Sequence, residues 1–398
     1  MDEHALQWLN LVLRWAHVVF GIAWIGTSFY FNWLNSRIHP PETPEPGVGG
    51  ELWSVHGGGF YRVVKYTVAP ARLPATLHWF KWEAYATWLS GFALLWLIYY
   101  LGARIYLLDP GVSGISIRSA VGIGLASLAG SWLVYDLLCR SPLGRRPDAL
   151  AAVVALLVTA LAWGLTRVFS ARGAYLHVGA ALGTIMAANV WRVIIPAQKE
   201  MVAAMAAGGV PDAARGKQAA LRSLHNNYFT LPVLFVMVSA HYPVTYGHPW
   251  SWALLAGLFL VGSATRHWFN LRNEGRRNAW LLPAAALGIV ALAFVTRPEQ
   301  TAGGGTAAGE TAVRFAAVRV IVAQRCAPCH SAAPTYPGMP VAQGGVVLDT
   351  PEQMRVWSAR ILERAVTART MPLGNVTGMT DEERSLLGEW VRAGAALR

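Results

Sequence analysis

The chain has 398 residues, of which 54% are hydrophobic and only 14% are charged, and its mean hydropathy is +0.36. Soluble domains carry about 25% charged residues, so this composition argues against a soluble protein and indicates an integral membrane protein. The formal net charge of +12 comes mainly from short connections between apolar segments. Without a basic soluble domain, this charge gives no reason to expect nucleic acid as a partner.

Apolar segments dominate the first three quarters of the chain. We identify eight segments that are long enough to cross a bilayer, which takes about 20 mostly apolar residues. They cover residues 8–34, 80–102, 118–139, 149–168, 174–196, 224–243, 250–271 and 279–296. Trp and Tyr lie at many of their ends, as is typical of membrane–water interfaces. The sequence therefore predicts an all-α fold, in which residues 1–297 form a polytopic bundle of about eight spans in a lipid bilayer.

Lys and Arg are concentrated in alternate connections between these segments. The first, third, fifth and seventh connections carry most of them, whereas residues 1–4 contain none. The positive-inside rule then places the odd connections in the cytoplasm and both termini outside. We expect a bacterial cytoplasmic (inner) membrane, with the C-terminal part of the chain on the periplasmic side.

The first connection contains an unusual run from His56 to Arg62, with glycine at positions 57, 58 and 59. Three glycines allow backbone amides to converge on an anion, and His56, Tyr61 and Arg62 would add donors or a base. The alternative is a plain turn, which glycine runs more often form.

Six histidines of the predicted spans fall into two layers. The outer layer holds His17, His177 and His241, and the cytoplasmic layer holds His78, His225 and His267. Ionisable groups in a membrane are costly and often functional. The layers therefore suggest ligands of two haem b groups that carry electrons across the bilayer, with His17 and His177 as one pair. The alternative is that these imidazoles only hydrogen-bond to backbone or lipid headgroups.

Amides and cations also gather at the cytoplasmic ends of the spans. The candidates are His78, Asn189, Arg192, His225, Asn226, Asn227 and His267. With the run from His56 to Arg62, they would line a polar pocket for a flat, hydrogen-bonding anion. Arg62 and Arg192 would supply positive charge. We favour His225 or His56 over His78 as the base, because an imidazole titrates near neutral pH.

The C-terminal part begins with residues 298–310, whose Gly, Ala and Thr content is typical of a flexible linker. Further on, Cys326, Cys329 and His330 form the CxxCH pattern of covalent haem c attachment, in which the histidine ligates the iron. The alternative is a zinc site, which needs a second Cys/His pair. The only other cysteine, Cys139, lies far upstream in an apolar segment.

A methionine is the expected sixth ligand of such a haem. Met371 precedes Pro372 in an irregular stretch and is the preferred candidate, with Met339 as the alternative. A helix is predicted at about 311–325, and a second opens with a capping box from Thr380 to Glu383. Residues 311–398 therefore resemble a class I cytochrome c.

Three motifs carry a more specific resemblance. Residues 53–61 (WSVHGGGFY), 77–85 (LHWFKWEAY) and 223–228 (SLHNNY), followed by the CxxCH pattern, resemble the membrane-bound urate oxidase (urate hydroxylase) family, often called PuuD. The resemblance spans essentially the whole chain. It implies oxidation of urate to 5-hydroxyisourate in purine catabolism, with electrons passed to the fused cytochrome c. From there they would reach a terminal cytochrome oxidase or a soluble cytochrome c.

A second, shorter resemblance concerns residues 14–24. They are similar to the first helix of HemJ-type protoporphyrinogen oxidases, in which a histidine at the place of His17 is associated with haem b. It leaves open another class of function, a quinol-linked or other membrane electron-transfer protein whose bundle only anchors the cytochrome and relays electrons. Such a carrier has little use for the polar run at residues 56–62.

Overall fold

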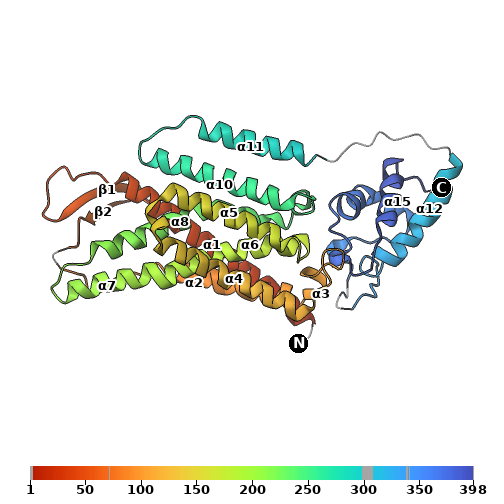
Figure 1. The fold of residues 1–398 in the computed structure, drawn as a ribbon, viewed down its shortest axis with the longest axis horizontal. Coiled ribbons are helices and arrows are strands. Elements are labelled where there is room, and N and C mark those ends of the chain that lie inside the picture. The colour runs from red at the N-terminus through yellow and green to blue at the C-terminus, as the bar shows by residue number, and fades with distance from the viewer. Residues whose placement is uncertain (1–2, 71, 298–307, 338, 340, 398) are drawn as a thin grey trace.

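The computed structural model describes residues 3–70, 72–297, 308–337, 339 and 341–397. Within these residues the chain is mostly helical, with a long bundle up to residue 297 and a smaller helical domain from residue 308 onward (Figure 1). Most of the predicted linker at 298–310 lies outside the described residues.

The bundle begins with a long helix and a hairpin. These elements are α1 (Glu3–Arg37), β1 (Val48–His56), β2 (Gly59–Tyr66), α2 (Trp82–Leu95), the wider π-helical turn η1 (Trp96–Tyr100) that continues α2, and α3 (Ala103–Tyr106). The following elements are α4 (Ile117–Arg140), η2 (Pro142–Arg145), α5 (Pro147–Leu165), α6 (Ala171–Asn189), η3 (Val190–Ile194) and α7 (Ile195–Ala206). The last are α8 (Ala213–Ser239), α9 (Pro243–Tyr246), α10 (Ser251–Asn273) and α11 (Leu281–Val295).

Helix α6 is the centre of the bundle. It packs against α2, α4, α5 and α8, and α10 packs on the other side of α8. The main apolar core is built from these helices, with Tyr175, Val178 and Val236 among its fully buried side chains. Small residues allow the close approach: a Cβ on Gly179 would lie 2.5 Å from Val236 of α8.

Four helical stretches of the described chain are long and apolar enough to cross a membrane: His4–Arg37, Ile117–Arg140, Pro147–Leu165 and Ala171–Ala206. Helix α11 is apolar but shorter. Helices α2 with η1, α8 and α10 coincide with the remaining predicted spans. That all eight cross the bilayer stays a prediction.

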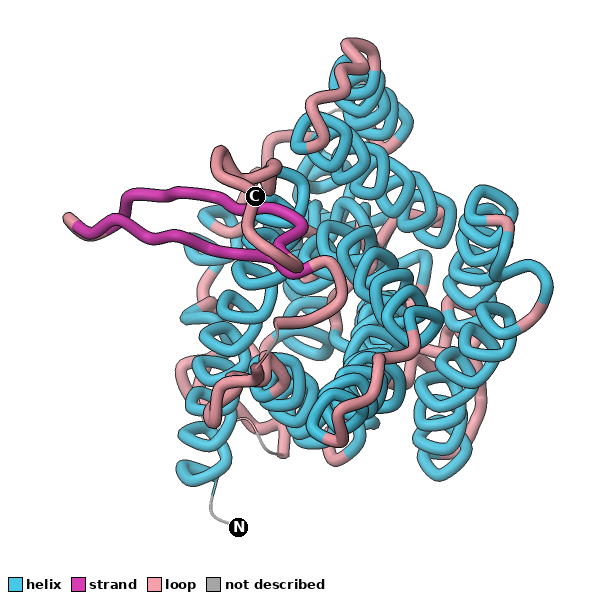
Figure 2. The backbone as a smooth tube through the Cα atoms, turned by 90° about the vertical axis from the view of Figure 1, so that its left-hand side faces the viewer, coloured by secondary structure: helices cyan, strands magenta, loops and turns pink. Residues whose placement is uncertain are grey.

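The first connection departs from the all-helical expectation, because its glycine-rich run forms the turn of an antiparallel hairpin. His56 pairs with Gly59, and Gly57 and Gly58 both have positive φ, at 56° and 80°. Two consecutive positive φ values are what a tight two-residue hairpin turn requires. The glycines therefore serve the turn, and the hairpin projects away from the helices (Figure 2).

The hairpin and the C-terminal domain lie at opposite ends of the bundle (Figure 1). Helix α1 starts at the end that carries the C-terminal domain and runs toward the hairpin. This arrangement agrees with an even number of helical passes between the two termini.

The C-terminal domain consists of short helices around its own apolar core. Its elements are α12 (Ala308–Ile321), η4 (Val322–Cys326), η5 (Gln343–Gly345), α13 (Pro351–Val356), α14 (Ser358–Ile361), η6 (Leu362–Thr367), η7 (Leu373–Asn375) and α15 (Asp381–Arg392). Val318, Leu387 and Trp390 are almost fully buried in that core. The predicted capping box is confirmed: the Thr380 hydroxyl accepts from the Glu383 amide, and the Glu383 carboxylate accepts from the Thr380 amide.

Candidate functional site

A buried ion pair lies between α4 and α8, near the hairpin end of the bundle. Arg222 is 3% exposed and donates to Asp136 at 2.6 Å and to the Asn189 side-chain oxygen at 3.1 Å. Its guanidinium also lies over the Tyr135 ring, 5.0 Å from the centroid. The second Asp136 oxygen accepts from Arg140. Both charges are therefore paired, as burial demands.

Amide hydrogen bonds continue this network toward α6. Asn189, which is fully buried, donates to the Tyr135 hydroxyl at 3.2 Å and to the Asn226 oxygen at 2.9 Å. Asn226 in turn donates to the Met186 carbonyl. We call Tyr135, Asp136, Asn189, Arg222, His225 and Asn226 the inner cluster. Its amides and its ion pair satisfy one another, so the cluster holds α4, α6 and α8 together.

His225 is the half-buried member of the inner cluster. Its Nδ1 lies 2.7 Å from the Tyr135 hydroxyl and 4.0 Å from the sulfur of Cys139. Nε2 has no partner among the described residues. Tyr135 and Asp136 are not among the site residues predicted from the sequence, although an acidic residue within an apolar segment is itself a signal.

Arg192 does not join the inner cluster. Its side chain is exposed and lies beside Trp191, with 5.9 Å between the guanidinium carbon and the ring centroid. Residues three apart share a face of a regular α-helix, but η3 has the wider turn of a π-helix and changes the direction of Arg192. Arg222 of α8 occupies the place beside Asn189 instead.

The hairpin residues are also separate from the inner cluster. His56 and Tyr61 are exposed on the hairpin, and Arg62 is bound by Glu45 and Glu51. The hydrogen bonds that Arg62 donates to Glu45 and Glu51 raise its pKa. Since its charge is already paired, Arg62 is not a free anion ligand in this arrangement.

A second polar group lies on the other side of α8, against α10 and α1. Arg266 donates from Nε to the Asn227 oxygen at 2.8 Å and from one Nη to Asn32 at 3.4 Å, and it stacks 4.0 Å from the Phe29 ring centroid. Next to it on α10 is the buried Asn270. We call Arg266, Asn227 and Asn270 the arginine–amide group.

Two more predicted residues lie near this group. His267 is exposed, and its Nδ1 is 2.6 Å from the Tyr228 hydroxyl. His78 precedes α2 and packs edge to face on Phe80, which packs in turn on Phe31 of α1. The structure thus divides the predicted pocket residues between two faces of α8.

In the C-terminal domain, the CxxCH motif follows directly from η4. The His330 amide donates to the Cys326 carbonyl at 2.9 Å, and Nδ1 of His330 faces the Val346 carbonyl at 3.2 Å. That contact leaves Nε2 free as a metal ligand, the usual arrangement around a ligating histidine. Cys326 and Met371 pack against the same apolar core, so the residues present fit a haem c. Met339 is buried but lies outside that core cluster.

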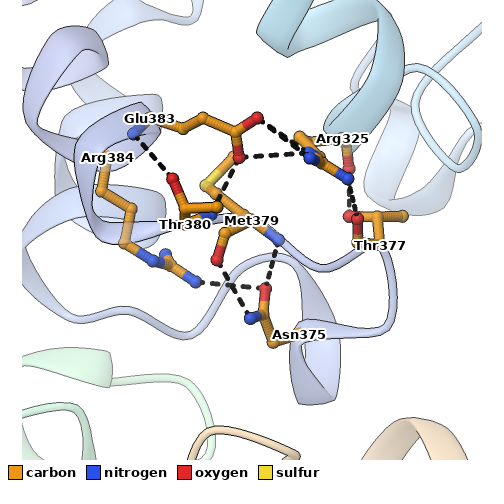
Figure 3. Close-up of polar contacts among 7 residues, drawn as sticks. All are labelled: Arg325, Asn375, Thr377, Met379, Thr380, Glu383 and Arg384. Carbon is orange, nitrogen blue, oxygen red and sulfur yellow. Dashed lines mark hydrogen bonds and ion pairs between the residues drawn. The ribbon is translucent and has the colours of Figure 1, made fainter.

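An ion pair fixes the start of the motif. Arg325 donates to Glu383 on α15 at 3.0 Å and to the Thr377 carbonyl, and the Thr377 hydroxyl donates back to the Arg325 carbonyl (Figure 3). Arg384 reaches the Met371 carbonyl at 2.7 Å from the same helix. Helix α15 therefore positions both the cysteine motif and the Met371 loop.

His17 and His177 each have one ring nitrogen on a backbone carbonyl. Nδ1 of His17 is 2.9 Å from the Thr87 carbonyl, and Nδ1 of His177 is 2.8 Å from that of Gly173. Their neighbours on α2 and η1 differ, because His17 packs on Gly91 and His177 on Tyr100. Haem b, with His17 and His177 as its ligand pair, stays a prediction.

Comparison with known proteins adds one match. The family model described as "Urate oxidase N-terminal" matches residues 3–297, which include the hairpin, the inner cluster and the arginine–amide group. No curated protein and no solved structure matches the chain.

Proposed function

Since the chain belongs to the urate oxidase N-terminal family, we propose that it is a membrane-bound urate oxidase (urate hydroxylase) with a fused cytochrome c. It converts urate to 5-hydroxyisourate in the bundle. The electrons pass to haem c in residues 311–398, and then to a terminal cytochrome oxidase or a soluble cytochrome c. The observation that carries the proposal is the family match to the bundle in a chain that also holds the Cys326–His330 motif.

The reaction balances with water as the source of oxygen. Urate and one water give 5-hydroxyisourate, two protons and two electrons. Covalent haem c, when bound, would supply a one-electron acceptor, so each urate would require two successive one-electron transfers. The protein must therefore bind an anion, remove protons from water and urate, and leave the electrons a route to the other end of the bundle.

Two histidines suit the proton step. His225 is oriented by Tyr135 and His267 by Tyr228, and each keeps Nε2 free of any partner among the described residues. An imidazole held in this way is a common general base. His225 was favoured by the sequence, and the position of Arg266 adds His267 as the second candidate.

The residues that would hold haem c are Cys326 and Cys329 through thioethers, and His330 and Met371 as iron ligands. Burial raises the pKa of the Cys326 thiol to about 12, so this cysteine does not exist as a free thiolate near neutral pH. Among the described residues, no group of three or more His, Cys, Asp and Glu side chains is placed to hold a metal ion.

The proposed location is the bacterial cytoplasmic membrane, with eight spans and the cytochrome on the periplasmic side. The alternating Lys and Arg distribution supports this orientation, and so does the separation of the hairpin from the C-terminal domain (Figure 1). Urate would then be oxidised near the cytoplasmic end, and the electrons would leave at the other.

The test is anaerobic addition of urate to the purified full-length protein. We expect the absorption bands of reduced haem c to appear, and 5-hydroxyisourate to form with one product per two haems reduced. The variant Cys326→Ser should oxidise no urate when haem c is the obligatory acceptor. Reduction by a quinol with no response to urate would contradict the proposal and favour the electron-carrier alternative.

A further inference from the structure

The arginine–amide group contains a buried cation with no acid beside it. Arg266 is 4% exposed, and none of the described Asp or Glu side chains forms an ion pair with it. Arg222 makes a useful contrast, because it is equally buried but is paired with Asp136. An unpaired buried charge is costly unless a ligand supplies the missing partner.

The neighbouring amides have unused hydrogen-bonding capacity. Both side-chain polar atoms of Asn270 and the nitrogen of Asn227 are buried without a partner in the described structure. Arg266 uses Nε and one Nη, and its other Nη makes no hydrogen bond to the described residues. Most buried polar side chains in proteins are satisfied, so this concentration of unused donors and one unused acceptor indicates a binding site.

We propose that Arg266, Asn227 and Asn270 bind the urate monoanion, an inference that rests on the proposed function. Urate is planar, is negatively charged at neutral pH and carries lactam edges on which a carbonyl lies next to an N–H. The Asn270 amide presents one acceptor and one donor, which complements such an edge. Arg266 supplies the charge, and its guanidinium is held in position by Phe29 and Asn227.

The site also selects between the two candidate bases. Asn227 follows His225 by two residues, which is about 200° around the axis of α8. His225 faces Tyr135 of α4, whereas Asn227 faces Arg266 of α10. His267 adjoins Arg266 in sequence and is held by Tyr228, so it is the histidine on the side of the urate site.

The test combines three full-length variants. Arg266→Gln removes the charge, and Arg272→Gln removes an exposed arginine further along the same helix as a matched control. Asn270→Asp places a carboxylate one turn from Arg266, where residues four apart are neighbours. That carboxylate pairs with Arg266 and competes with urate, so the variant should fold at least as stably as the parent.

Urate binding is measured by equilibrium dialysis, and haem c content and thermal stability are recorded for each variant. We expect Arg266→Gln and Asn270→Asp to weaken urate binding at least tenfold with unchanged haem content, and Arg272→Gln to bind as the parent does. If Arg266 were merely structural, Asn270→Asp would bind urate normally, and that result would overturn the site.

The readout separates this site from the proposed function. Suppose that the parent binds urate, that Arg266→Gln and Asn270→Asp do not, and that urate does not reduce haem c in the parent. The site then stands and the oxidase proposal fails. If urate reduces haem c with the same half-saturating concentration in the parent and both variants, the oxidase proposal stands and the site fails. A parent that binds no urate overturns both.

Discussion

At the scale of single residues, the pairing of Arg222 with Asp136 makes a sharp prediction. Asp136→Asn keeps the shape of the side chain but leaves Arg222 buried without a counter-charge. Breaking a buried pair in this way costs about 3 to 5 kcal/mol, so we expect a clear fall in the thermal stability of the detergent-solubilised protein. The matched variant Arg140→Gln removes the other, exposed partner of Asp136, and should cost under about 1 kcal/mol. Equal losses of stability in Asp136→Asn and Arg140→Gln would contradict the prediction that the buried pair of Arg222 with Asp136 provides the stabilisation.

The same pair shows what the sequence could predict at this scale. Asn189, His225 and Asn226 were identified as polar residues near the ends of apolar segments, and the structure brings them together. Arg222 lies in the connection between the predicted segments 174–196 and 224–243, where the sequence pattern marks it only as one of the loop cations. Its bond to Asp136 joins positions 86 residues apart, and no local pattern encodes such a contact. On a regular α-helix, a spacing of three residues would place Arg192 beside Asn189. This spacing fails where η3 widens the turn.

At the scale of elements, hydropathy located the helices well. Predicted segments such as 118–139 and 250–271 agree within two residues with α4 and α10, because long apolar runs fix helix positions directly. The two strands of the hairpin were not predicted, although a plain turn was the alternative given for the three glycines and is what Gly57 and Gly58 form. Helix α7 was missed too, because a helix can continue past the apolar segment that starts it.

The contact between η4 and α15 carries the second prediction. Burial alone would raise the pKa of Glu383, but hydrogen bonds from Arg325 and the Thr380 amide hold it below its usual value. A lowered pKa in the folded state means that the stabilisation is present above the unfolded pKa, about 4.3, and is lost as the pH falls through the folded value. Glu383→Gln should therefore lower stability by about 1 kcal/mol at neutral pH.

This deficit should shrink as the pH falls below the unfolded pKa, about 4.3, and be lost once the carboxyl of the folded parent is protonated too. Unfolding of the C-terminal domain in denaturant, followed through the absorption of the proposed haem c, measures the difference. The control is Asp381→Asn in the same turn of α15, whose ion pair with Arg369 is exposed on both sides. A deficit for Glu383→Gln that is independent of pH would show that the charge of Glu383 is not the cause.

At the scale of the whole molecule, the Met371 loop is seated directly on the far end of the bundle. A Cβ on Gly374 would lie 2.6 Å from the Leu108 carbonyl just after α3, and one on Gly247 would lie 2.3 Å from the Ala368 carbonyl. Between the two parts is a small cavity, lined among others by Arg172, Tyr246 and Arg369. Met371, the proposed haem ligand, therefore lies between two contacts with the bundle. Ala368 touches Gly247 just after α9, and Gly374 touches Leu108 just after α3.

This docking predicts that Gly374 controls electron transfer without taking part in haem binding. In Gly374→Ala the new methyl group meets the Leu108 carbonyl, and the residue keeps an unfavourable φ of +56°, a backbone strain of about 1 to 3 kcal/mol. Gly378→Ala carries similar strain at φ +68°, but its nearest neighbour is 3.8 Å away within the same domain. Comparing the two variants separates loss of contact with the bundle from backbone strain.

We expect Gly374→Ala to slow urate-driven reduction of haem c in stopped-flow measurements, while reduction by ascorbate, which needs no bundle, proceeds as in the parent. Equal slowing in Gly378→Ala would mean that the contact with α3 is not the route by which electrons enter the C-terminal domain.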